Sequence, residues 1–448
     1  MGVGGPGERQ GAEHLPEEVR RRWVGRLPSR QLPVAYFAFG HLCLILAFAI
    51  VAWNPWGVMG FFYHARILAV VHLITLGWIT SSIFGALYFL VPLALQGRLS
   101  AGRGDLWSFG AVAVGISGMV AHFWLDSPSG MAWSAGLLLI GFVLPVKKIL
   151  GALLAAKVEA GVKLHLVFAF LNLMLAGAMG LLIGIDKVEH FLPGHIHARV
   201  FAHAHLAAVG WATLMVVAVG YRLLPMLLPS ALPQGPSILL GAVLLESGVL
   251  GLFVTLLLGG GFPVLPFAGL TVAGLSIFFY WLRFMLLHRR RPPQARPRLD
   301  PGLFHVAQGF AYLVVTVVLG CVLAVVPSST WSLGAVMVYG VTAFLGFLAQ
   351  LILGIAPRIL SILSWLWASA QDSFRESPES PFAMPSRLLQ WVVLGLWSVG
   401  VPGLAAGLAL DLVPLVRSAA GWLLFAALLE AINFHRIVRH SWPARSRE

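Results

Sequence analysis

Twelve long apolar runs, separated by short polar segments, make up most of this chain. They cover residues 33–53, 67–92, 106–124, 130–147, 163–185, 200–226, 237–258, 263–287, 303–326, 331–356, 388–410 and 412–434. A helix that crosses a bilayer needs about 20 apolar residues, so each run predicts one transmembrane helix. The pattern therefore predicts an all-α membrane protein, with about twelve spans over 33–434 and basic tails at 1–32 and 435–448.

Composition and charge place this domain in a membrane and orient it. Of the 448 residues, 59% are apolar and 10% are charged, which excludes a soluble enzyme and a nucleic-acid-binding module. The net charge is +13, and Lys and Arg concentrate in the tails and in alternate loops, including 288–301 and 359–387. Because basic loops stay on the cytoplasmic side, both termini are predicted to be cytoplasmic, in a bacterial inner (plasma) membrane.

An internal repeat relates the second span to the sixth. Residues 64–92 and 197–225 match at 12 of 29 positions without a gap. Four spans separate the copies, so both run the same way through the membrane. The repeat predicts three pseudo-symmetric blocks of four helices, at about 33–147, 163–287 and 303–434.

The third copy of the repeat is more diverged. Its aligned residues are Gly346, Phe347 and Gly354, which fall on Gly77, Trp78 and Gly85 of the first copy. Val341 stands where the first two copies have histidine. The third block is therefore predicted from these weaker matches, and the sequence leaves open whether it is functional.

Histidine is the polar residue that most needs an explanation in so apolar a chain. Seven of the 15 lie at or near the non-cytoplasmic ends of the second and sixth spans: His64, His72, His190, His195, His197, His203 and His205. Ionisable groups at membrane depth usually serve function, and imidazole with few carboxylates suits haem iron, copper or zinc. A single histidine in a span more often bonds a neighbouring helix, but the repeated context favours ligands here.

The repeat pairs two of these histidines. His72 and His205 hold the same place in the two copies, so they are predicted to face each other across the iron of a haem b between the second and sixth spans. His203 and His205 are two residues apart and point about 200° apart on a helix, so one span can serve two sites. His203, with His195 or His197, is the candidate holder of a second haem or a copper ion.

Other repeated residues suggest the surroundings of such a haem. Arg66 and Arg199 lie about 9 Å further along their helices, a height suited to pairing with haem propionates. Trp78 and Trp211 are candidates to flank the porphyrin, the alternative being packing. No catalytic residue is predicted, although Glu246, in mid-span, is a candidate for a proton step or a hydrogen bond to a neighbouring helix.

Two segments resemble subunit I of the haem–copper oxidases. HLITLGWITSSIFGALYFLVP at 72–92 is similar to its second transmembrane helix, especially in the cbb3-type and nitric-oxide-reductase branches. AHAHLAAVGWATLMVVAVGYRLLP at 202–225 is similar to its His-x-His helix. The resemblance implies that His72 and His205 ligate a low-spin haem and that His203 ligates a high-spin haem.

The sequence also departs from that family. The His-x-His helix is the tenth there and the sixth here, and residues 237–258, where copper ligands are expected, contain no histidine. No His-x-x-x-Tyr pattern is present. The resemblance therefore implies a shorter, divergent relative, comparable in type to the NnrS-type haem–copper membrane proteins.

The predicted function is that of a haem-binding membrane protein in respiratory electron transfer or in the handling of oxygen or nitric oxide. Its expected partners are the lipid bilayer, a cytochrome c or quinol donor, and other membrane subunits. If the protein is an enzyme, it is an oxidoreductase of the cytochrome c oxidase or nitric oxide reductase type. Two alternatives are a copper, zinc or haem transporter or chaperone that uses the outer histidines, and a complete terminal oxidase subunit.

Overall fold

The computed structural model describes residues 30–192, 194–259, 263–290, 299–326, 330–371 and 380–441. In these segments, twelve helices are long and apolar enough to cross a membrane, and no strand is present. The twelve-span, all-α fold predicted from the apolar runs is confirmed.

Each block has four spans, and a π-helix interrupts the second of them. The first block contains α2 (Gln31–Trp53), a short 3-10 helix η1 (Pro55–Val58), the second span α3 (Ala65–His72), η2 (Leu73–Thr80) and α4 (Ser81–Leu93), then α5 (Arg103–Trp124) and α6 (Pro128–Ala155). The second block contains α7 (Ala160–Glu189), the second span α8 (Ile196–His205), η3 (Leu206–Thr213) and α9 (Leu214–Leu227), then α10 (Pro236–Leu258) and α11 (Leu265–Leu287). The third contains α12 (Pro301–Val325), the second span α13 (Thr330–Val341), η4 (Thr342–Ala349) and α14 (Gln350–Gln371), then α15 (Arg387–Ala409) and α16 (Val413–Arg439).

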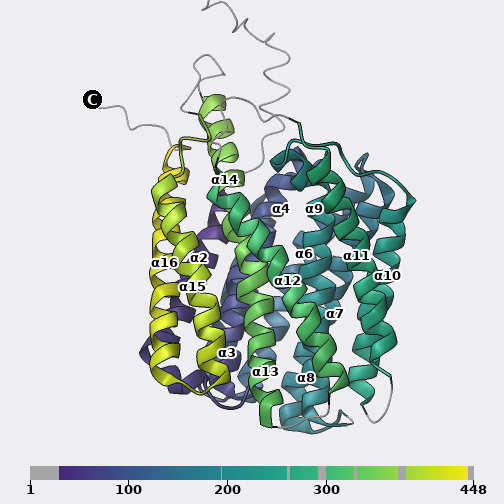
Figure 1. The fold of residues 1–448 in the computed structure, drawn as a ribbon, viewed down its shortest axis with the longest axis vertical. Helices are drawn as coiled ribbons and strands as arrows, with labels where there is room; N and C mark the ends of the chain where they lie inside the picture. The colour runs from purple at the N-terminus through teal and green to yellow at the C-terminus, as the bar shows by residue number, and fades with distance from the viewer. Residues whose placement is uncertain are drawn as a thin grey trace, which may run out of the picture.

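The helices pack by the same scheme in each block (Figure 1). The third and fourth spans form antiparallel pairs, α5 with α6, α10 with α11 and α15 with α16, while the first span packs on the second. Helix α6 packs on α7, and α16 packs on α2, so the last block returns to the first. This arrangement puts the three second spans where all three blocks meet, and the first two of them carry the candidate histidines.

The three π-helices confirm that the third block is a repeat of the other two. Segment η4 follows Val341 in the same register as η2 follows His72 and η3 follows His205. A glycine at the same position in each π-helix lets the first span of its block come close. A Cβ added to Gly77, Gly210 or Gly346 would lie 2.5, 2.6 or 2.5 Å from Cys43, Asn172 or Tyr312, respectively. π-Helical turns often occur at functional sites, and these three contact one another at the centre.

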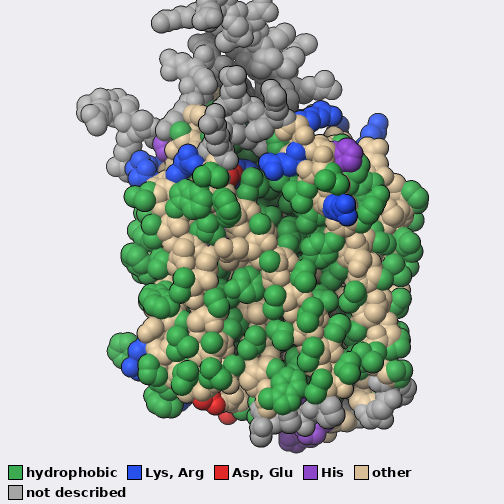
Figure 2. Space-filling model, viewed as in Figure 1, with side chains coloured by type: hydrophobic (Ala, Val, Ile, Leu, Met, Phe, Trp, Pro, Cys, Tyr) green, Lys and Arg blue, Asp and Glu red, His purple; other side chains and the backbone are tan. Residues whose placement is uncertain are grey.

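The two ends of the bundle differ in charge. Figure 2 shows Lys and Arg gathered mainly at the upper end, whereas histidine side chains are visible at both ends. Both ends of the described chain lie at the basic end, where the guanidinium of Arg30 donates to the carbonyl of Ser441 at 2.6 Å. An even number of spans requires the two ends to share a face, and the assignment of that face to the cytoplasm stays a prediction.

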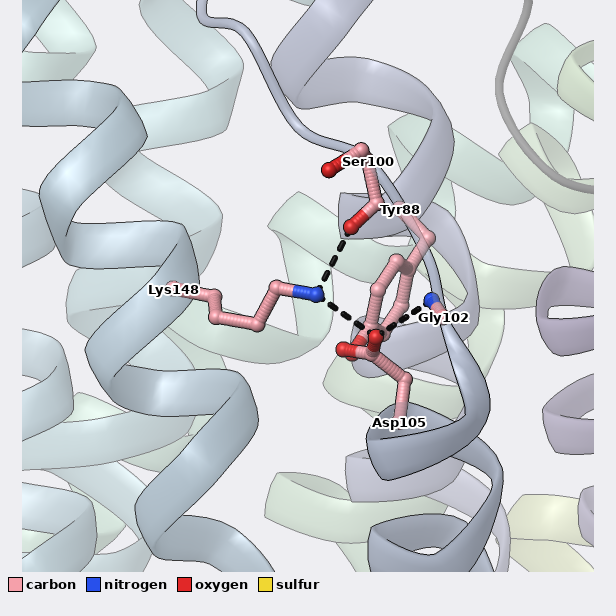
Figure 3. A network of polar contacts seen from close by, with 5 residues as sticks. All are labelled: Tyr88, Ser100, Gly102, Asp105 and Lys148. Carbon is pink, nitrogen blue, oxygen red and sulfur yellow. Dashed lines mark hydrogen bonds and ion pairs between the residues drawn. The ribbon is translucent and has the colours of Figure 1, made fainter.

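One buried carboxylate joins three spans at the basic end (Figure 3). Asp105 accepts hydrogen bonds from the hydroxyl of Tyr88 at 2.8 Å, the N–H of Gly102 at 2.7 Å and Nζ of Lys148 at 2.6 Å. The same ammonium donates to the carbonyl of Ser100 at 2.7 Å. The network fixes the ends of α4, α5 and α6 to one another.

The tenth span is longer than its apolar run predicted. The sequence suggested that a loop begins near residue 359, but α14 continues to Gln371 and projects beyond its neighbours (Figure 1). Ile359, Leu360, Leu363 and Trp367 are buried at helical spacing. Helix α14 therefore continues beyond the end of the apolar run at residue 356, because one face of it remains apolar.

Candidate cofactor site

A large cavity lies between the second spans in the half of the bundle away from the basic end. Its volume is about 970 Å³, within the range of about 300–1,000 Å³ that small-molecule and cofactor pockets usually have. Its walls are mostly apolar. Most of the polar side chains that line it belong to a small set: Tyr63, His72, Thr75, Thr80, Lys187, His197, His203, His205, Thr213 and Tyr339.

Three of the predicted ligands line this cavity, and each bonds a backbone carbonyl through the same ring nitrogen. Nδ1 of His72 lies 2.7 Å from the carbonyl oxygen of Leu68, and Nδ1 of His205 lies 2.8 Å from that of Phe201. Nδ1 of His203 lies 3.0 Å from a carbonyl oxygen on α7. A carbonyl oxygen only accepts, so Nδ1 carries the proton in each ring and Nε2 keeps its lone pair. This is the arrangement that orients a metal-binding imidazole.

The rings of His72 and His205 have different neighbours. His72 stacks on Phe123 of α5, in its own block, with ring centroids 4.8 Å apart. His205 stacks instead with Tyr339, at 6.4 Å. Within the described residues, no ring contact or hydrogen bond joins His72 to His205.

The repeat explains this arrangement. Tyr339 occupies in the third block the position that His203 occupies in the second, two residues before the position of His72 and His205. His205 thus meets, in the third block, the position that corresponds to His203. The pairing of His72 with His205 stays a prediction.

The remaining predicted ligands lie at the outer edge. The ring of His197 lines the cavity and packs against Phe61 at 5.3 Å and Tyr63 at 5.7 Å. His195 is the N-cap residue of α8, its ring centroid lies 4.8 Å from that of His197, and it is not among the lining residues. The described segments contain no group of three or more His, Cys, Asp or Glu that could hold a metal ion. The second site at His203, with His195 or His197, stays a prediction.

Neither predicted propionate partner lines the cavity. Arg199 is buried and is ion-paired with Asp186, and its guanidinium also donates to the carbonyl of Gly194 at 2.7 Å. Arg66 is exposed and lies over the ring of Trp124, 5.5 Å from its centroid. A buried guanidinium needs a nearby carboxylate, and one from α7 already occupies Arg199.

This pairing predicts that Arg199 is a structural residue. We expect Arg199→Ala to lower the unfolding temperature of the detergent-purified protein, because it leaves Asp186 without its cation. The double change Arg199→Leu with Asp186→Leu should recover part of the loss, measured by thermal unfolding. An Arg199→Ala protein that unfolds like the wild type would contradict the assignment.

The two tryptophans have different surroundings. Trp211 lines the cavity, and its Nε1 donates to the hydroxyl of Thr80 at 3.1 Å, which joins η3 to η2. Trp78 is buried and meets the ring of His41 edge-on at 4.8 Å, away from the cavity lining. Only Trp211 is placed to contact a molecule in the cavity.

The structure adds a cation that the sequence pattern missed. Lys187, near the end of α7, lines the cavity, and its Nζ lies 5.4 Å from the ring centroid of Tyr63. The hydroxyl of Tyr63 is buried without a partner, and burial raises the pKa of this phenol, so it remains a donor. The available signal was that Lys187 is the only lysine among the few basic residues predicted for the non-cytoplasmic face.

Comparisons with known proteins support the fold. No protein-family model and no curated protein matches this chain. Among solved structures, the chain is similar to a haem–copper terminal oxidase determined as a dimer by cryo-EM, with a TM-score of 0.56 and 11% sequence identity. The alignment covers 97% of this chain and 86% of that one. At 11% sequence identity, this similarity shows a shared fold and nothing more specific.

Proposed function

We propose that this protein is a membrane-embedded haem protein of the haem–copper oxidase type, which binds a b-type haem in the central cavity. His72 from the second span and one histidine of the His203–His205 pair on the sixth span would hold its iron. The observation that carries the proposal is the set of three imidazoles, each with Nδ1 bonded to a carbonyl and Nε2 free, around one apolar cavity.

The residues present fit this cofactor. The cavity is large and mostly apolar, as a porphyrin requires, and its metal-binding groups are imidazoles. We favour His203 as the second ligand over the predicted His205, because the ring of His205 stacks with that of Tyr339. A haem with two imidazole ligands supports one-electron transfer, and one with an open position binds diatomic gases.

Lys187 and Tyr63 are the groups that we expect to bind the propionates, in place of Arg66 and Arg199. We expect Lys187→Gln to weaken haem retention about tenfold, because a charge-assisted hydrogen bond is lost. Transfer of haem to apomyoglobin measures this change, with Arg66→Gln as the matched control. Equal retention in the Lys187 variant and the wild type would contradict the assignment.

The role that this site supports is respiratory electron transfer or the handling of oxygen or nitric oxide. A cytochrome c or quinol is the proposed electron donor, and further membrane subunits are proposed partners. A second haem or a copper ion beside His205 belongs to the same proposal. The resemblance to the cbb3-type and nitric-oxide-reductase branches stays a prediction.

The test is an optical spectrum of the detergent-purified protein with metal analysis. The proposal expects a reduced-minus-oxidised spectrum with the sharp bands of a low-spin b-type haem. A colourless protein that binds copper or zinc would overturn it in favour of a transporter or chaperone. Sustained oxygen uptake with a reduced donor would extend it to a complete terminal oxidase.

A further inference from the structure

A polar pair lies inside the second block, away from the cavity. Asn172 on α7 is fully buried, and Glu246 on α10 is 6% exposed. Neither residue lines the cavity. Their surroundings are the apolar interior of α7, α10 and η3.

The hydrogen bonds of this pair leave two oxygen atoms unsatisfied. Nδ2 of Asn172 donates to the carbonyl of Phe168 at 2.9 Å and to Oε2 of Glu246 at 2.7 Å, so both of its N–H groups are used. These two acceptors fix the orientation of the amide. Oδ1 of Asn172 and Oε1 of Glu246 are both buried without a partner. With an ionised glutamate, both atoms are acceptors only.

No countercharge reaches Glu246. Helix α10 packs against α7, α8, η3 and α11. The titratable groups of these elements are Lys163, His165, Asp186, Lys187 and Glu189 on α7, His197, Arg199, His203 and His205 on α8, and Tyr280 and Arg283 on α11, while η3 has none. In the described part of the chain, none of them forms an ion pair or a hydrogen bond with Glu246. An isolated buried carboxylate is strongly unfavourable and takes up a proton instead.

We propose that Glu246 and Asn172 form a proton-binding site within the membrane. One proton resides on Oε1 of Glu246, which donates to Oδ1 of Asn172, while Nδ2 of Asn172 donates to Oε2. The acid and the amide then form a closed pair with both orphan oxygens satisfied. The proposal uses no property of the haem and is tested independently of it.

The position of the pair links it to the sixth span. Gly210 of η3 packs on Asn172 so closely that an added Cβ would lie 2.6 Å from Cγ of the amide. His203 and His205 lie on the same span, between one and two helical turns before Gly210. Loss of the proton would therefore place a negative charge beside the π-helix of the ligand-bearing span.

Infrared spectroscopy of the full-length protein in lipid vesicles tests this site. We expect a protonated-carboxyl C=O band that persists to pH 8, is lost in Glu246→Gln and is retained in Glu430→Gln, a change at a different buried glutamate. Loss of a carboxylate band in Glu246→Gln, with the protonated band unchanged, would overturn the proposal.

A second variant tests the hydrogen bonds directly. Asn172→Ala removes both hydrogen bonds between Asn172 and the Glu246 carboxyl group, so the C=O band of Glu246 should move to higher frequency. An unchanged frequency in this variant would also overturn the pairing. Glu246→Gln should unfold at the wild-type temperature, because two amides form the same closed pair.

Discussion

Replacing His72 with alanine is expected to abolish the low-spin haem spectrum of the purified protein, and His203→Ala is expected to do the same. Each change removes one of the two cavity-lining imidazoles that we propose as ligands of the iron. A six-coordinate low-spin iron cannot form with one of them missing. His205→Ala should leave this signal intact, because His205 stacks with Tyr339 of the third block.

The control for these variants is another buried membrane histidine. His165 is fully buried, and its Nδ1 lies 2.8 Å from the carbonyl oxygen of Gly161, but it does not line the cavity. His165→Ala should therefore keep the spectrum. Loss of the signal in His205→Ala with retention in His203→Ala would restore the pairing predicted from like positions. An unchanged spectrum in His72→Ala would reject the site.

The second large effect is expected at the glycine of a π-helix. A Cβ added to Gly77 would lie 2.5 Å from Cβ and 2.7 Å from Sγ of Cys43, and both positions are on packed helices. We expect Gly77→Ala to destabilise the protein by about 1–3 kcal/mol, as overpacking of a core does. It should also lower haem content, because η2 directly follows His72. Thermal unfolding and haem-to-protein ratio measure both effects.

A compensating change separates steric overlap from other causes. In the double variant Gly77→Ala with Cys43→Gly, the removed side chain makes room for the new methyl group, so stability should partly return. Gly421 in α16 has nothing within 4 Å of an added Cβ, so Gly421→Ala should be neutral or slightly stabilising. Equal losses in the single and double variants would show that close helix approach is not the reason for this glycine.

The apolar runs and the repeat were sufficient to predict the fold, because spanning length and hydropathy are local properties of the chain. The alignment of Gly346 with Gly77 even placed η4 in its correct register. The π-helices themselves could not be predicted, because one extra residue in a turn leaves no compositional trace. The glycine shared by all three copies was the available signal.

The surroundings of the candidate site were harder to predict because they depend on contacts between helices. The sequence places Arg199 at a suitable height for a propionate, but Asp186 reaches it from α7. Lys187 reaches the cavity from that same helix. Likewise, the repeat predicts equivalent positions for His72 and His205. Which residues contact each other between two blocks depends on how the helices pack.

The most direct test of the account is a cryo-EM map of the protein purified from its own membranes. We expect planar density for a macrocycle in the cavity between η2 and η3, with iron bonded to Nε2 of His72 and of a histidine from the sixth span. A map in which side chains or lipid fill this cavity, with the two imidazoles facing apart, would contradict it.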